Sequence, residues 1–265
     1  MRRSPLPLRT LLAASVCLAA VSLPPRALAT PAVSLHAAFV PEILGHAATV
    51  HFRVQIAPTT ELLPPPLTEA SIRYPAGLAI SLSGLGIEAC SPQTLELSGP
   101  QGCPPDSLMG EGRAIAEFPV KHQVFRETAQ IAILRGAEQE GHLAMLLYVY
   151  EETAVNAELI LPTQLFPGSR PFGGRLQIQV PLVTTLPEAP DLAVAEIQLV
   201  LGPKDLVYYE RVHGKQIRYK PAGIKLPGHC PRGGFPFTIE LGFLGGTHSS
   251  ASTAVSCPPH SRRRG

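Results

Sequence analysis

The sequence predicts an all-β protein made of one or two tandem immunoglobulin-like antiparallel sandwiches with disulfides. Apolar and polar residues alternate with a period of two in many short segments, which is the pattern of strands that bury one face. No window long enough for an ordinary helix carries an apolar stripe at helical spacing. The 29 prolines and 23 glycines interrupt the apolar segments at short intervals, which favours a sandwich over alternating strands and helices.

The alternation is clearest in TVHFRVQI (49–56), RLQIQV (175–180) and FPFTIELGF (235–243). HLAMLLYVY (142–150) is apolar on both faces, so we expect it to be a central strand between two layers. Further strands are expected at 33–40, 68–74, 78–83, 113–118, 123–134, 155–161, 192–201, 206–212, 215–220 and 247–256.

Residues 1–29 have the pattern of a cleaved secretory signal. Arg2 and Arg3 form a basic start, residues 11–23 are mostly apolar, and Ala27-Leu28-Ala29 matches the small-residue pattern of a cleavage site. The apolar run is shorter than the roughly 20 residues that a membrane-spanning helix needs. We therefore expect secretion or a cell-surface location after cleavage near Ala29, with no transmembrane segment in the mature chain.

The charge balance argues against a nucleic-acid partner. The whole chain has 22 basic and 20 acidic residues, but four arginines and no acidic residue lie within 1–29. The mature chain therefore carries 18 basic and 20 acidic residues, a formal net charge of −2. A slightly acidic body lacks the basic footprint of nucleic-acid binding. Three of the remaining arginines lie in 258–265, which we expect to be a basic disordered tail.

Four cysteines remain in the mature chain, and an even number in an exported protein predicts two disulfides. Four cysteines allow three connectivities. We expect the pairing that is local in sequence, Cys90 with Cys103 and Cys230 with Cys257, because each pair falls within one expected domain.

A faint internal duplication suggests two units. VQIAPTTELLPPPLTEASIR (54–73) resembles IQVPLVTTLPEAPDLAVAEIQ (178–198), and both read as a strand, a proline-rich bend and a second strand. The most loop-like stretch in mid-chain is FPGSRPFGG (166–174). We therefore expect one β-sandwich domain at 30–167 and another at 168–257.

The segment CSPQTLELSGPQGCPPDSLMGEG (90–112) contains PDSL, which is similar to the nucleophile block of GDSL hydrolases. Such a site needs glycine where Pro105 stands, and Asp occurs in the mature chain only at 106, 191 and 205. The chain therefore has no acid–histidine block that would activate Ser107. The cysteines and histidines lack the short paired spacing of a zinc site. We expect no catalytic residue, no metal site and no cofactor, and we interpret Asp106 and Ser107 as a turn or cap.

The segment LVYYERVHGKQIRY (206–219) predicts a hairpin whose two-residue turn is His213-Gly214. With Val212 opposite Lys215, period two gathers five side chains on one face: Tyr209, Arg211, Gln216, Arg218 and Lys220. Such a basic face could hold an anionic polymer or a sugar acid. The favoured interpretation is the charged, solvent-exposed side of an edge hairpin, protected from strand addition by its charges.

A family resemblance is carried by YPAGLAI (74–80) and by GCPPDSLMGEGRA (102–114). The pattern Pro-x-Gly-Leu, then Cys, then Cys-Pro-x-x-Ser-x-x-Gly resembles a module of uncharacterised exported β-sandwich proteins of high-GC Gram-positive bacteria. Here it is formed by Pro75, Gly77, Leu78, Cys90, Cys103, Pro104, Ser107 and Gly110. The resemblance implies export, a β-sandwich and disulfides, and it assigns no catalytic residue.

Together these observations predict a non-enzymatic structural or adhesive protein at the cell surface. We expect its partner to be a cell-wall polymer or another surface protein. The alternative is a carbohydrate- or cell-wall-polymer-binding module, although the chain offers no Trp and only six Tyr for stacking on sugars. An exported hydrolase is a third interpretation.

Overall fold

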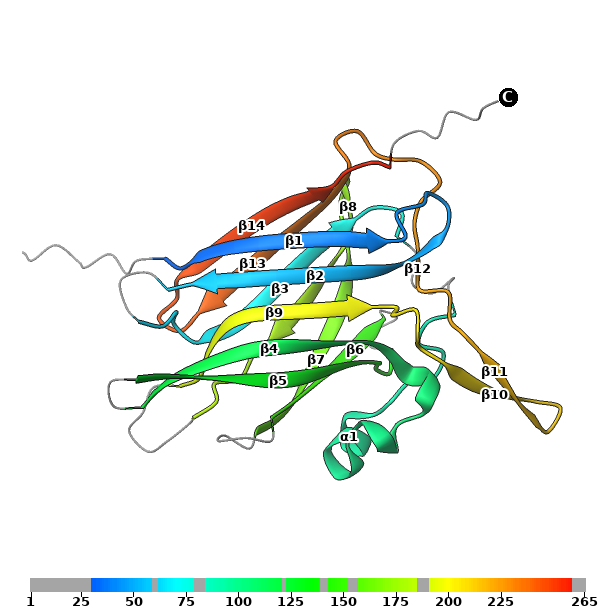
Figure 1. The fold of residues 1–265 in the computed structure, drawn as a ribbon, viewed down its shortest axis with the longest axis horizontal. Helices are drawn as coiled ribbons and strands as arrows, with labels where there is room; N and C mark the ends of the chain where they lie inside the picture. Colours follow the sequence, from blue (N-terminus) through cyan, green and yellow to red (C-terminus); the bar gives the residue numbers. More distant parts are fainter. Residues whose placement is uncertain are drawn as a thin grey trace, which may run out of the picture.

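The computed structural model describes residues 30–58, 62–78, 84–120, 123–138, 143–151, 157–184 and 191–258. Over these ranges the protein is almost entirely β, as the sequence predicts (Figure 1). Its strands are β1 (Ala32–Val40), β2 (Ala47–Ala57), β3 (Leu67–Pro75), β4 (Leu108–Val120), β5 (Gln123–Arg135), β6 (Ala144–Glu151), β7 (Ala157–Pro167), β8 (Phe172–Gln179), β9 (Ala193–Leu201), β10 (Tyr208–Val212), β11 (Lys215–Tyr219), β12 (Ile224–Lys225), β13 (Phe235–Phe243) and β14 (His248–Val255). The short helices are α1 (Pro92–Ser98), η1 (Pro100–Gly102) and η2 (Pro105–Ser107).

Some of the sequence predictions fall outside the described residues. These are the signal peptide at 1–29, most of the strand expected at 78–83, and the basic tail after Pro258. Among the residues that the structure does describe, no helix has the length and apolar character needed to cross a membrane.

Eleven strands form one continuous antiparallel sheet in the order β1-β2-β9-β4-β5-β6-β7-β8-β3-β13-β14, and β12 pairs with β2. Because all neighbours are antiparallel and the number of strands is odd, β1 and β14 run in the same direction. These two strands lie side by side at a seam without a backbone ladder, where the Ser249 hydroxyl donates to the Pro31 carbonyl at 2.5 Å. The sheet is therefore curled into a barrel-like wall around one interior (Figure 1).

This architecture corrects the expectation of immunoglobulin-like sandwiches in separate domains at 30–167 and 168–257. β9 lies between β2 and β4, and β3 lies between β8 and β13, so strands from both ranges alternate in one sheet. The two segments that resemble each other in sequence, 54–73 and 178–198, pair with each other through β2–β9 and β3–β8. Local alternation specifies a strand but not its distant partner, so the sequence pattern is compatible with either arrangement.

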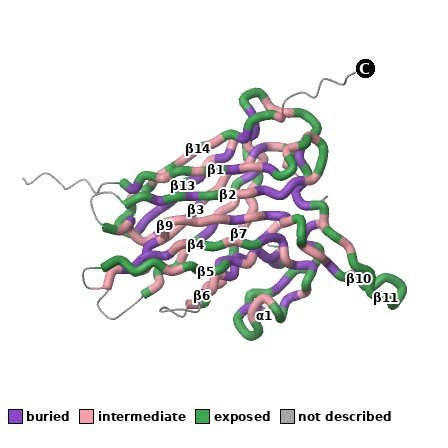
Figure 2. The backbone as a smooth tube through the Cα atoms, viewed as in Figure 1, coloured by how far each residue is buried: buried purple, intermediate pink, exposed green. Residues whose placement is uncertain are grey.

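An aromatic cluster fills part of the interior. The ring centroids of Phe39 and Phe235 are 5.3 Å apart, and those of Phe52 and Phe237 are 5.2 Å apart, both edge-to-face. Pairs of this kind contribute about 0.5–1.5 kcal/mol beyond the area that they bury. Figure 2 shows that buried segments follow the strands of the wall, whereas the tip of the β10–β11 hairpin is exposed.

The strand β6 is covered on both sides, as its doubly apolar sequence predicts. Met145 and Leu147 belong to the main interior cluster. Leu146 and Tyr148 face outward and belong to a second cluster, where they pack with Leu95 of α1. Helix α1 therefore forms a local outer layer on this part of the wall.

A buried tyrosine forms hydrogen bonds with the connection between β3 and β4. Tyr208, at the start of β10, is 0% exposed, and its hydroxyl donates to the Leu108 carbonyl and accepts from the Gly86 amide at 2.9 Å. Arg135 of β5 holds the same segment, because its guanidinium donates to the carbonyls of Gly86 at 2.9 Å and Ile87 at 3.2 Å. The base of the β10–β11 hairpin is thus tied to the wall by buried polar contacts.

We expect Tyr208→Phe to lower the free energy of unfolding by about 1–3 kcal/mol, because it leaves a buried amide and a buried carbonyl without their partner. Urea unfolding followed by circular dichroism measures this difference. Tyr209→Phe is the matched control, since Tyr209 is the adjacent residue and is 50% exposed. Equal stability of the two variants would contradict the buried role of the Tyr208 hydroxyl.

Candidate binding groove on the outer face

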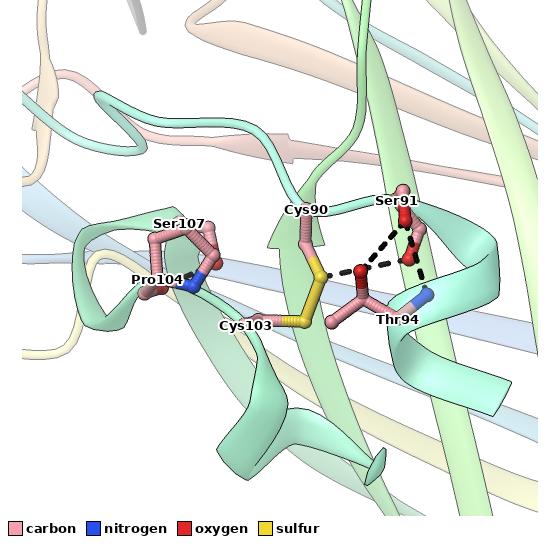
Figure 3. The surroundings of a disulfide bond; sticks show 6 residues. All are labelled: Cys90, Ser91, Thr94, Cys103, Pro104 and Ser107. Atoms are coloured by element: carbon pink, nitrogen blue, oxygen red, sulfur yellow. Dashed lines mark hydrogen bonds between the residues drawn. A yellow bond between two sulfur atoms is a disulfide. The ribbon is translucent and has the colours of Figure 1, made fainter. Parts of the chain in front are cut away.

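The segment between Cys90 and Cys103 folds as a capped helix that is closed by a disulfide (Figure 3). The Ser91 hydroxyl accepts from the Thr94 amide at 3.0 Å and is 2.8 Å from the Thr94 hydroxyl, which makes Ser91 the N-cap of α1. Pro92 follows at the first helical position, where its missing N–H has no cost. Both predicted disulfides are present, and the second joins Cys230 to Cys257.

Helix α1 and η1 form one wall of a groove whose other wall is the outer face of the sheet. The groove has a volume of about 1060 Å³, which is as large as the pockets that hold small ligands. Its sheet side is lined by β4, β5, β6, β7 and β9, and its helix side by residues 96–101. The disulfide-closed segment thus positions one wall of the groove and adds Glu96 and Ser98 to its lining.

A row of polar side chains crosses the sheet, and all of its members except Arg53 line this groove. Cross-strand register places these residues next to one another on six successive strands, from β2 to β7: Arg53, Gln198, Arg113, Gln130, Tyr150 and Glu158. Neighbouring strands are about 4.8 Å apart, so the row spans roughly 24 Å. Every member of this polar row can donate or accept hydrogen bonds through its side chain.

Part of the polar row is held in place by neighbouring side chains. The Arg113 guanidinium donates to the Gln198 amide oxygen at 3.1 Å. Glu196 accepts from Arg53 at 3.0 Å and from Gln55 at 3.3 Å, and it also accepts from Gln198. Hydrogen bonding from Arg53 is the largest of the effects that lower the pKa of Glu196 below its ordinary value. This end of the row is therefore a fixed network of charged and amide groups.

Near the other end of the polar row, Tyr150 lies beside Tyr148 of the same strand, β6. Their ring centroids are 5.6 Å apart, with the Tyr150 ring half-buried and the Tyr148 ring buried beneath α1. The Tyr148 hydroxyl donates to the Glu158 carboxylate at 2.8 Å. Burial, followed by this hydrogen bond, raises the pKa of Tyr148 to about 12. The groove thus offers an aromatic surface next to a carboxylate.

The predicted basic face lies elsewhere, on the hairpin that projects from the wall. The register has Val212 opposite Lys215, and His213 and Gly214 both have positive φ, at 50° and 77°, as the sequence predicts. All five residues of that face are exposed: Tyr209, Arg211, Gln216, Arg218 and Lys220. None of them lines the groove.

The PDSL segment, whose sequence is similar to a hydrolase nucleophile block, forms a buried turn. Ser107 is 0% exposed, and its hydroxyl donates to the Pro104 carbonyl at 2.6 Å inside the one-turn helix η2 (Figure 3). Asp106 and Ser107 therefore form the turn expected from the sequence. In the described parts of the chain, no group of three or more His, Cys, Asp or Glu side chains could hold a metal ion.

Comparisons with protein-family models, with curated proteins and with solved structures find no match for this chain.

Sequence reasoning missed the groove because its sheet side comes from five strands that are not all neighbours in sequence. The outward positions of Arg113, Gln130 and Tyr150 follow from period two. Their alignment depends on β9 joining β2 to β4, which no local pattern predicts. Helix α1 was missed because it has only seven residues, although Ser91-Pro92 is a recognisable helix start.

Replacing Cys90 and Cys103 together by alanine should loosen the helix wall of the groove. A closed loop of this length contributes about 3 kcal/mol on the chain-entropy model. We expect faster hydrogen exchange at the amides of Leu95, Gly99 and Gly102, which donate within this segment. The control replaces Cys230 and Cys257, and it should lower stability without selectively exposing those three amides. Unchanged exchange in the first variant would mean that α1 does not depend on its disulfide.

Stability should fall as pH rises from 10 to about 12, partly because of Tyr148. Its folded-state pKa of about 12 lies above the ordinary value of 10.0. The folded protein therefore retains this proton where the unfolded chain loses it, so the contribution is complete below pH 10 and disappears towards pH 12. Denaturant titrations between pH 10 and 12 should show that the free energy of unfolding declines less steeply with pH in Tyr148→Phe than in the unaltered protein. Tyr208 and Tyr219 have pKa values of about 12 as well, so some slope should remain. If Tyr148→Phe had the same dependence of unfolding free energy on pH as the unaltered protein, the contribution of Tyr148 would be contradicted.

Proposed function

We propose that this chain is an exported, non-enzymatic adhesive protein of the cell surface that binds a carbohydrate or another hydroxyl-rich cell-wall polymer in the outer groove. The observation that carries the proposal is the polar row, in which six hydrogen-bonding side chains cross six strands beside an aromatic surface. A secretory signal pattern at 1–29 and two disulfides support a location outside the cytoplasm.

The chemistry of the groove suits a neutral or weakly charged glycan. Sugar hydroxyls both donate and accept, and the row alternates guanidinium and amide groups before ending on a tyrosine and a carboxylate. Tyr150 offers a half-buried ring for contact with the apolar face of a sugar. Contacts repeated at strand spacing favour an extended chain over a compact ligand, because a polymer lying across the strands meets one polar group per strand.

The buried position of Ser107, the serine of the hydrolase-like PDSL segment, supports a non-enzymatic role. The Ser107 hydroxyl is buried and donates to a backbone carbonyl of its own turn. A nucleophile needs a base within hydrogen-bond reach and access to substrate.

A second candidate surface is the basic face of the β10–β11 hairpin. Tyr209, which is 50% exposed, adds an aromatic ring to the cationic side chains of this face. That combination favours an anionic polymer or another surface protein as its partner.

Binding is tested by depletion of the mature protein from solution with insoluble cell-wall polysaccharide. We expect Arg113→Ala and Tyr150→Ala to weaken binding about tenfold each, the loss typical of an important interface side chain. Tyr150→Phe should retain most of the binding, because the ring remains.

Arg73→Ala is the matched control for Arg113→Ala. Arg73 lies on β3, outside the groove, and forms an exposed ion pair with Glu240 at 2.8 Å. Its removal should leave polymer binding unchanged. The proposal fails if the protein stays in solution with every wall polysaccharide, or if the groove variants and the Arg73 variant bind alike. Binding that is lost only with Arg211→Ala or Arg218→Ala would assign the activity to the hairpin.

A further inference from the structure

The interior of the curled sheet contains a second, separate space. A partly enclosed cavity of about 130 Å³ lies among inward-facing side chains of β1 to β9 and β13. All the side chains that line it are apolar except that of Glu151. The cavity lies inside the wall and the groove outside it, so this inference does not rest on the proposed function.

Small side chains on one part of the wall account for the cavity. Ala114 of β4 faces Ala129 of β5 in register, and Ala116 follows on the same strand. Ala70 of β3 and Ala157 of β7 also line the space. Bulky phenylalanines fill another part of the interior, so the alanine side leaves volume that no neighbouring side chain occupies.

The one charged side chain in the lining comes from the last residue of β6. Glu151 is 5% exposed and is paired across the ladder with Ala157, whose methyl group leaves room beside the carboxylate. A carboxylate offers about four acceptor positions, so it can accept from a ligand in addition to its contacts with the protein. An acceptor in an otherwise apolar lining defines the orientation of a bound molecule.

We propose that this cavity binds a small apolar molecule that carries one hydrogen-bond donor, with its hydrocarbon part among the alanines and its donor on Glu151. The volume fits this class, since an engineered cavity of about 150 Å³ lined by Leu, Ile and Phe stays dry and binds benzene. A benzene-sized ring or a short branched alkyl group with one hydroxyl or ammonium group matches both the size and the single acceptor. A ligand carboxylate carries no donor, and burying its charge in an otherwise apolar cavity is costly.

The test uses four probes of nearly equal shape: toluene, benzyl alcohol, benzylamine and benzoate. Each is titrated into the full mature protein while methyl resonances are followed by NMR. We expect ligand-to-methyl NOEs at Ile131, Leu147 and Ile197, which line the cavity. Benzyl alcohol and benzylamine should bind roughly three- to tenfold more tightly than toluene, the gain typical of one net hydrogen bond. Benzoate should not bind.

Two variants separate the donor contact from simple burial. Glu151→Leu should remove the preference for the alcohol and the amine while toluene still binds. Ala129→Leu should fill the cavity and abolish all NOEs to its methyl groups, whereas Ala254→Leu, at an exposed position on β14, should bind like the unaltered protein.

Three results would overturn the proposal. The first is that no probe gives NOEs to the three methyl-bearing residues in the unaltered protein. The second is binding of all four probes with equal affinity. The third is a preference for the alcohol and the amine that survives Glu151→Leu. The variants have separate readouts. If Ala129→Leu fails to fold, the four-probe series and Glu151→Leu still test whether the cavity binds a molecule with one donor.

Discussion

The alternation of side chains across a single curled sheet is the constraint on which both sites depend. In β6, Leu147, Val149 and Glu151 point into the barrel-like interior, while Tyr148 and Tyr150 point out. A slip of one residue in strand register would exchange these sets and would remove the groove and the cavity together. The cross-strand pairing of β6 with β5 and β7 therefore places Tyr150 in the outer groove and Glu151 in the interior cavity.

The hydrophobic interior, and not the disulfides, joins the two halves of the chain. Cys90–Cys103 closes a loop of local sequence around α1, and Cys230–Cys257 joins the chain before β13 to the chain after β14. The contacts that unite distant segments are the β2–β9 and β4–β9 ladders and the side chains packed beneath them. Cross-links outside the main wall allow the sheet to curl without distortion.

The sequence predicts strands well and their order poorly, for a physical reason. Period two in 49–56 and 235–243 reports burial of one face, which any sheet provides, so these strands were predicted correctly. The β10–β11 register was also predictable, because His213-Gly214 restricts the turn. The insertion of β9 between β2 and β4 depends on contacts between distant residues, and the polar row and the cavity depend on that insertion.

The odd number of strands has a mechanical consequence. β1 and β14 run in the same direction at a seam without a backbone ladder, so the described chain enters at one end of the barrel and leaves at the other. A tensile force between residues 30 and 258 therefore pulls along the strand axes and is carried as shear by the antiparallel ladders around the wall. Ladders loaded in shear must break many hydrogen bonds at once, which suits the adhesive function proposed above.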